Sequence, residues 1–127
     1  MKTRSGKSSA ASRFAYDGLN RVIHERARLS VLTSLVTHSK GLLFSELKGL
    51  CALTDGNLNR HLLVLEGARL VSVTKTLGGV RPQTHFRITA LGRRRYLDYL
   101  AVLEQVILDG AVALKADKLP GDTPASA

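Results

Sequence analysis

The fold is decided by residues 45–67, which read SELKGLCALTDGNLNRHLLVLEG. Leucines recur at steps of three and four in two runs separated by a short break, which is the spacing of one helix face. Each run follows a hydroxyl that can cap a helix, Ser45 for the first and Thr54 for the second. We therefore predict a helix over Glu46–Ala52 and, after a tight turn, a helix that ends near Gly67. This order is typical of a helix-turn-helix.

The residues before this stretch predict one more helix. Apolar side chains from Leu19 to Val36 recur at helical spacing, which predicts a first helix from about Asp17 to His38. Gly41 stands where a helix stop is expected. The short apolar run Leu42–Phe44 predicts a very small strand before the second helix.

After residue 67 the period of the pattern changes to two. Leu70–Thr76 is rich in β-branched residues and predicts a strand, residues 77–83 have loop composition, and Thr84–Thr89 predicts a second strand. Thr89 can also cap a last helix that begins at Ala90 and runs for about twenty residues, roughly 30 Å. The predicted fold is therefore mainly α with a small β-hairpin, an α+β class.

The length of 127 residues suits one domain, which we place at residues 14–117, between a flexible basic arm at 1–13 and a disordered tail at 118–127. A membrane-spanning helix needs roughly 20 apolar residues. Neither such a run nor a signal peptide is evident, so we expect a cytoplasmic protein without a membrane partner. The single cysteine, Cys51, lies among leucines, which favours a buried structural role.

Positive charge is the strongest compositional signal. The formal net charge is +9 at pH 7, and residues 1–28 hold seven Lys and Arg against two acidic residues. This balance indicates a polyanionic partner, and nucleic acid is favoured over an anionic membrane or a simple aid to solubility.

Enzyme motifs and metal-ligand clusters are not found in the sequence. It contains no phosphate-binding loop, no GxSxG elbow and no spaced carboxylate pair, so we expect no catalytic residues and no cofactor. The histidines are dispersed, and the close pair His24-Glu25 has no cysteine near it. Because a metal site needs three or four converging ligands, we expect no metal site.

The third predicted helix presents a polar face opposite its leucines. Arginine can bond guanine as a fork and asparagine can pair with adenine, while glycine permits a close approach of the backbone. A helix that follows such a turn enters the major groove of DNA with its N-terminal residues. The candidate DNA-contacting residues of this helix are Thr54, Gly56, Asn57, Asn59, Arg60, His61 and Val64.

The hairpin tip is a second candidate element, because its cations and hydrogen-bond donors suit phosphates or a narrow minor groove. Its candidate DNA contacts are Lys75, Gly78, Gly79, Arg81, Gln83 and Thr84. For the cluster Arg93–Arg95 at the start of the last helix, three roles stay open: partial phosphate contact, solvation, or pairing between subunits.

The long helices at the two ends carry more apolar surface than one domain of this size can cover. Pairing with a second copy is the simplest remedy, so we expect a homodimer. The candidate interface residues are Leu19, Val22, Ile23, Tyr96, Leu100, Leu103, Val106 and Ile107. The apolar helices also leave room for a small-molecule effector, although no polar cluster specifies a ligand.

Several short blocks of the sequence together match the pattern of a known family. They are RLSVL at 28–32, FSELK at 44–48, LTDGNLNRHL at 53–62, VLE at 64–66, VTKT at 73–76, PQT at 82–84 and ITALGR at 88–93. Through them residues 25–107 resemble the winged-helix regulators of the MarR-like and ArsR-like superfamily, and most of all its short bacterial and archaeal winged helix DNA-binding domain subgroup. The resemblance implies a dimer whose helix from Thr54 lies in the major groove and whose Lys75–Thr84 hairpin is the wing.

The sequence departs from this family in the turn after the third helix. The family usually has Ala-Gly there, whereas this chain has Gly67-Ala68-Arg69, so an arginine stands at the usual glycine position. Because a positive φ at a non-glycine residue costs about 1 kcal/mol, we expect the turn to re-form around Gly67.

The resulting hypothesis is a sequence-specific, double-stranded-DNA-binding transcriptional regulator. It acts as a homodimer on two half-sites about one helical turn, roughly 34 Å, apart. Two alternatives stay open. One is a chromatin-like binder without sequence preference, in which the basic arm dominates, and the other is a winged-helix adaptor that binds another protein.

Overall fold

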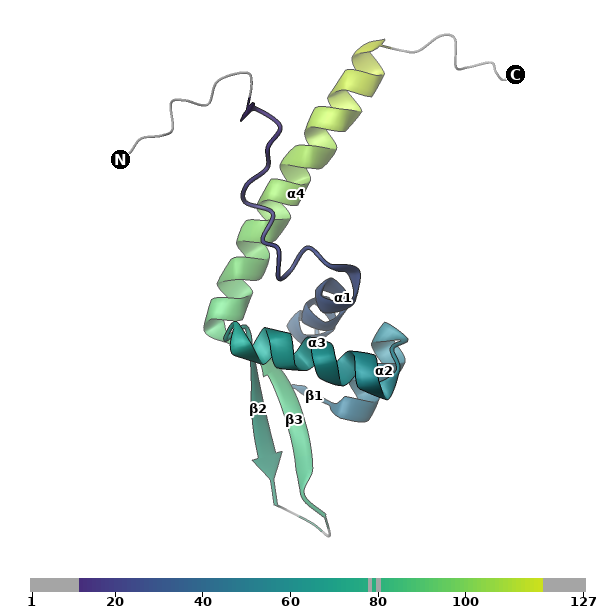
Figure 1. Ribbon diagram of the computed structural model, residues 1–127, viewed down its shortest axis with the longest axis vertical. Helices are drawn as coiled ribbons and strands as arrows, with labels where there is room; N and C mark the ends of the chain where they lie inside the picture. The colour runs from purple at the N-terminus through teal and green to yellow at the C-terminus, as the bar shows by residue number, and fades with distance from the viewer. Residues whose placement is uncertain (1–11, 78, 80, 118–127) are drawn as a thin grey trace, which may run out of the picture.

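The computed structural model describes residues 12–77, 79 and 81–117. In this part of the chain the elements are, in order, α1 (Arg26–Val36), β1 (Leu42–Leu43), α2 (Phe44–Cys51), α3 (Asp55–Gly67), β2 (Val71–Thr76), β3 (Gln83–Ile88) and α4 (Ala90–Asp117). Figure 1 shows a small head of helices and sheet, a β2–β3 hairpin that extends from it, and the long α4 that leaves it in the opposite direction. The predicted α+β class is confirmed. The predicted arm and tail lie almost wholly outside the described residues.

α1 begins at Arg26 rather than near Asp17, so the predicted start of the first helix is wrong. The Asn20 side-chain oxygen accepts hydrogen bonds from the backbone N–H groups two and three residues later, at 2.8 and 3.3 Å, which holds a turn in place of a helix. Glu25 is then the N-cap residue, because its carboxylate accepts the Arg28 N–H at 2.9 Å.

The leading segment, residues 12–25, runs along α4 instead of forming a helix (Figure 1). Two side-chain contacts fasten it there. The Tyr16 hydroxyl donates to Asp109 at 2.5 Å, and His24 Nδ1 lies 2.6 Å from the Tyr99 hydroxyl oxygen. The leading segment therefore covers one side of α4 within the same chain.

The helix-turn-helix has one predicted cap and one that the sequence pattern missed. Thr54 caps α3 as predicted, since its hydroxyl oxygen accepts the Asn57 N–H at 3.2 Å. In α2 the N-cap residue is Leu43 instead of Ser45, and the Glu46 carboxylate reaches back to accept the Leu43 N–H at 2.8 Å. α2 therefore starts two residues earlier than the hydroxyl pattern suggests.

The sheet has the order β1-β3-β2, and both pairs of strands are antiparallel. Val73 lies opposite Phe86 and Thr74 lies opposite His85. Because side chains alternate along a strand, Phe86 and Ile88 share the buried face. Thr74 and His85 belong to the outer face, which points away from the helices.

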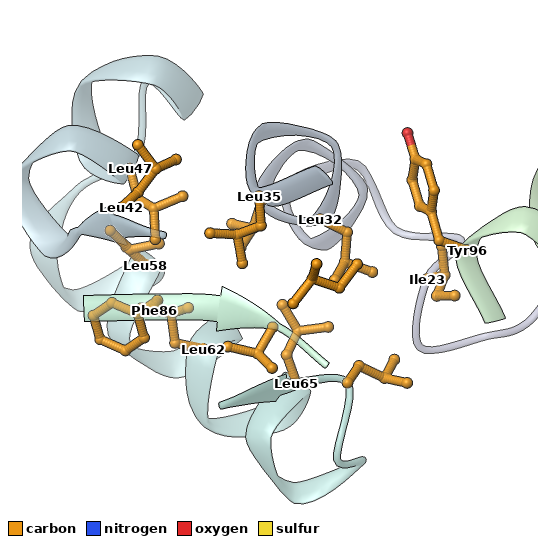
Figure 2. Packing of buried hydrophobic residues seen from close by; sticks show 14 of the residues in the cluster. Ile23, Leu32, Leu35, Leu42, Leu47, Leu58, Leu62, Leu65, Phe86 and Tyr96 are labelled. Atoms are coloured by element: carbon orange, nitrogen blue, oxygen red, sulfur yellow. The ribbon is translucent and has the colours of Figure 1, made fainter. Parts of the chain in front are cut away.

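The hydrophobic core lies between α1, α3 and the inner face of the sheet. Its largest fully buried side chains are Ile23, Val31, Leu32, Leu35, Leu47, Leu58, Leu65 and Tyr99. Figure 2 shows the leucines of α1 and α3 pointing toward one another across this core. Leu47 and Leu50 are three residues apart, which predicts that both face the core, but Leu50 is 56% exposed and this prediction is wrong for it.

Two residues assigned to a dimer interface belong to this core as well. Ile23 is fully buried, and Tyr96 is buried with its hydroxyl 2.7 Å from the Thr33 hydroxyl oxygen. Both side chains are therefore used within one chain, and the prediction that they face a second copy is wrong.

The turn after α3 is formed by Arg69, not by Gly67. Arg69 has a φ of 65°, in the left-handed region, while Gly67 is the last residue of the helix. The Leu70 N–H reaches back to the Leu65 carbonyl at 3.0 Å, and the Thr89 hydroxyl donates to the Arg69 carbonyl at 2.8 Å. These bonds hold the strained residue in place, so the expectation of a turn re-formed around Gly67 is wrong.

α4 has 28 residues, which makes it about 42 Å long and longer than predicted. Thr89 caps it as predicted by accepting the Gly92 N–H at 2.8 Å. A Cβ atom at Gly92 would lie 2.3 Å from the Leu70 carbonyl oxygen, so this position needs glycine. Within the described ranges, no helix combines the length and the apolar character that crossing a bilayer requires.

Candidate nucleic-acid interface

The face of α3 that points away from the core carries most of the predicted DNA-contacting residues. Thr54, Gly56, Asn57, Asn59, Arg60 and Val64 are all exposed. The Arg60 guanidinium donates to the Asn57 side-chain oxygen at 3.0 Å. The two side chains best suited to reading base edges are thus held side by side.

His61 does not belong to this face, so its predicted contact with DNA is wrong. It is only 6% exposed. Its Nδ1 lies 3.2 Å from Arg28 Nη1 and 3.8 Å from Glu25 Oε1. The backbone N–H of Arg28 holds the pKa of the Glu25 carboxyl below its usual value, and the His61 and Arg28 side chains lower it further. His61 therefore joins α3 to the start of α1 and does not reach outward.

Leu63 is a candidate that the sequence pattern missed. It is 59% exposed and lies on α3 beside Asn59 and Arg60, three to four residues earlier. The pattern missed Leu63 because it stands in a run of apolar residues, 62–65, of which only Leu62 and Leu65 face the core. An exposed apolar side chain on a recognition helix can contact the methyl group of thymine.

A hollow of about 410 Å³ flanks α3 on the side of α1. It lies between the start of α1, the end of α2 and the first two turns of α3, and its lining includes Arg26, Asn57 and Arg60. Cys51 also lines it and is only partly buried, with its sulfur 3.5 Å from the Ser34 hydroxyl oxygen. The expectation of a fully buried cysteine is therefore not met.

The β2–β3 hairpin extends beyond the head (Figure 1) and carries the predicted wing residues that the structure describes. Lys75, Gly79, Arg81 and Gln83 are exposed, and Thr84, opposite Lys75, is partly buried. Gly79 has a φ of 86°, a conformation that favours glycine, while Gly78 lies outside the described residues. The hairpin can therefore offer a lysine and an arginine near its tip.

α4 carries a broad apolar surface on the part that leaves the head. Leu100, Leu103, Val106 and Ile107 from the predicted interface lie there, and Leu97 joins them. Four of them, Leu97, Leu100, Leu103 and Ile107, line a hollow of about 440 Å³ together with Ala101 and Glu104. Of the other predicted interface residues, Leu19 and Val22 are partly buried against the core of their own chain.

The remaining charged groups form no metal site. Among residues 12–77, 79 and 81–117, no three His, Cys, Asp or Glu side chains are grouped so that they could hold an ion. Arg93–Arg95 are exposed at the start of α4, where Arg95 lies 3.9 Å from Asp98 of the same helix.

The chain is similar to known regulators both in sequence and in structure. The family model of the winged helix DNA-binding domain matches residues 27–107. A transcriptional regulator homologue from Pyrococcus horikoshii OT3 is 32% identical with a TM-score of 0.66, and the match covers 72% of this chain and 89% of that one. No curated protein sequence matches the chain.

Two more distant structures share the fold. A PadR family transcriptional regulator from Eggerthella lenta DSM 2243 is 21% identical with a TM-score of 0.55, over 72% of this chain and 86% of that one. NadR, solved in complex with 4-hydroxyphenylacetate, is 22% identical with a TM-score of 0.58, over 94% and 95%.

These relatives are transcriptional regulators and not enzymes, and the matched residues include the whole helix-turn-helix and hairpin described above. Fold, exposed helix face and sequence agree, and the chain belongs to the winged helix DNA-binding domain family.

Proposed function

We propose that this DNA-binding regulator recognises specific sequences in double-stranded DNA and acts as a homodimer. The observation that carries the proposal is the exposed Arg60–Asn57 pair on α3, joined at 3.0 Å. An arginine fork fits guanine O6 and N7, and an asparagine amide fits adenine N6 and N7. Because the pair is already ordered, less rotamer freedom is lost when it meets base edges.

The composition of the exposed α3 face favours sequence reading over binding to any DNA. A binder that only neutralises phosphates needs cations, whereas this face also offers Asn59 and the exposed apolar side chains Leu63 and Val64. Amide and apolar groups distinguish base pairs through adenine edges and thymine methyl groups. A chromatin-like role, which relies on phosphate contacts, would make no use of these amide and apolar side chains.

The wing supplies the sequence-independent part of the affinity. Lys75 and Arg81 are exposed on the hairpin beside the α3 face. In the proposed complex they contact backbone phosphates or a narrow minor groove. Each neutralised phosphate releases counterions, so the affinity falls steeply as salt is added.

The apolar surface of α4 supports a homodimer. Ile107 is 60% exposed and stands with Leu97, Leu100 and Leu103 around one hollow. A second α4 packed there would cover these side chains, and a two-fold axis between the copies would present two α3 helices to two half-sites about one turn apart.

A small-molecule effector fits this scheme at the hollow beside α3. The structure of NadR holds 4-hydroxyphenylacetate. In the present chain the hollow of about 410 Å³ is lined by Asn57 and Arg60, so an anionic compound bound there would occupy the side chains that read DNA. Such a compound would weaken DNA binding, and fluorescence anisotropy with a panel of small carboxylates tests for it.

The proposal is tested by selecting bound duplexes from a random-sequence pool and titrating the enriched duplex against a scrambled one by fluorescence anisotropy. We expect at least a hundredfold preference for the enriched duplex, well within the range of specific binders. Equal affinity for both would favour the chromatin-like role. No binding at low salt would favour the protein-adaptor role.

The homodimer is tested separately by analytical ultracentrifugation. The full chain is expected to sediment as a dimer, and Ile107→Glu is expected to yield a monomer, because a charge cannot be buried unpaired in an apolar interface. Ser72→Glu, on the exposed outer face of the sheet, is the matched control and is expected to remain dimeric. A monomeric wild-type protein would refute the dimer.

A further inference from the structure

The outer face of the sheet, away from α1 and α3, carries a second polar hollow. This outer-face pocket has a volume of about 270 Å³ and is lined by Lys40, Thr74, Thr76, His85 and Arg87. Lys40 and Arg87 bring two positive charges, and the threonines and the imidazole bring further polar groups. None of the five lining residues is acidic.

Arg87 is directed into this pocket by the local backbone. Its Nε donates to the Lys40 carbonyl at 3.2 Å, which leaves its terminal nitrogens free to face a ligand. The side chain passes Gly41, the residue before β1, where a Cβ atom would lie 2.9 Å from Arg87 Cγ and 3.0 Å from the Phe86 carbonyl oxygen. Gly41 also has a φ of 96°. Glycine at this position therefore leaves room for the Arg87 side chain to reach the backbone of Lys40.

Lys40 and Arg87 form no ion pair with any of the described residues. In the described part of the chain the ion pairs are Lys48–Asp55, His61–Glu25 and Arg95–Asp98, and none of them involves Lys40 or Arg87. Two like charges that share a hollow raise its potential and attract an anion.

His85, which also lines the pocket, has a ring nitrogen whose hydrogen-bonding capacity is unused. Its Nδ1 is buried without a hydrogen-bond partner, and an unpaired buried polar atom is costly and rare.

We propose that the outer-face pocket binds a phosphate group. Ligand pockets typically span about 300–1,000 Å³, so this smaller hollow suits one compact charged group and not a whole metabolite. A guanidinium, an ammonium and two hydroxyls together match the several acceptor oxygens of phosphate. The group comes either from a DNA backbone that passes the outer face or from a free phosphorylated compound. The pocket lies on the sheet face opposite α3, so the proposal does not depend on base reading.

The first test follows backbone amide shifts by NMR as inorganic phosphate replaces chloride at constant ionic strength. We expect saturable shifts at residues 72–76 and 83–88 in the wild-type chain. K40Q and R87Q are each expected to weaken binding at least tenfold, and R87K to retain most of it. K115Q removes the same charge from the exposed last turn of α4 and is expected to bind as the wild type does.

The second test assigns the source of the phosphate. If it belongs to DNA, R87Q lowers the slope of log affinity against log salt by about one, and K115Q lowers it less. If the phosphate belongs to a free compound, R87Q loses the binding of inorganic phosphate but keeps the salt slope of the wild type. The proposal is overturned if phosphate gives no saturable shift at this pocket and the slope is unchanged in R87Q. It is also overturned if K115Q loses phosphate binding as R87Q does.

Discussion

The Thr89 hydroxyl donates a 2.8 Å hydrogen bond to the carbonyl of Arg69. The same oxygen accepts the Gly92 N–H at 2.8 Å and so caps α4. One side chain therefore ties the strained turn after α3 to the first turn of α4. This link fixes the direction in which α4 leaves the head, because both ends of the hairpin are held by it.

The strain at Arg69 can be relieved by glycine. With a φ of 65°, Arg69→Gly is expected to stabilise the fold by about 1 kcal/mol, since glycine adopts this conformation without a Cβ penalty. Ala68→Gly is the neighbouring control and is expected to destabilise, because Ala68 has an ordinary φ of −85°. Urea unfolding measures both, and a lower midpoint for Arg69→Gly would contradict the argument.

Two glycines of α4 should respond to alanine in opposite directions. At Gly92 the added methyl group meets the Leu70 carbonyl oxygen at 2.3 Å, whereas at Gly110 it meets nothing within 4 Å. Gly92→Ala is expected to destabilise by about 1–3 kcal/mol or more through overpacking. Gly110→Ala is expected to stabilise by about 0.5–1 kcal/mol through helix propensity. Thermal unfolding by circular dichroism compares them, and effects of the same sign would count against this packing.

Glu25 should make stability depend on acidic pH. Its carboxyl has a folded-state pKa below the ordinary 4.5, mainly because it accepts the Arg28 N–H. A depressed pKa gives stability that is present above the unfolded-state pKa and is lost as pH falls through the folded-state pKa. We expect Glu25→Gln to be less stable than the wild type at pH 7 and the difference to shrink below about pH 4.5. Urea unfolding between neutral and acidic pH measures this, and a pH-independent difference would disprove it.

Arg60 and Lys75 should affect DNA binding in different ways. Arg60→Ala is expected to cost about 1–3 kcal/mol on the selected duplex and to relax its base preference, because a forked base contact is lost. Lys75→Ala is expected to weaken all duplexes alike and to lower the salt slope by about one. Anisotropy titrations on selected and scrambled duplexes separate the two. If Arg60→Ala lowers the affinity for both duplexes equally, Arg60 does not contact base edges.

The parts of the fold that local chemistry sets were predictable from the sequence. Thr54 and Thr89 cap α3 and α4 because a hydroxyl before a helical run satisfies backbone N–H groups, whatever the tertiary structure. The hairpin and the core face of Phe86 and Ile88 follow from alternation along the strands in the same way.

Other features depend on contacts that sequence spacing does not contain. Leu19 and Ile23 have helical spacing, but the Asn20 side chain replaces the helix with a turn that docks on α4. His61 is buried although the pattern predicts that it faces DNA, and Leu63 is exposed although it stands in an apolar run, because α1 lies against one flank of α3 and not the other. The pattern gives the period of a helix, whereas the neighbours decide which side is covered.

The leading segment makes the folded unit of this chain longer than the region that the family model matches. The family match begins at residue 27, yet Ile23 is completely enclosed and Tyr16 and His24 bond to α4. A fragment that began at the family boundary would lack the residues that cover Tyr99, and it would expose apolar side chains in the first half of α4. The folded unit of this regulator thus includes residues that precede the domain it shares with its family.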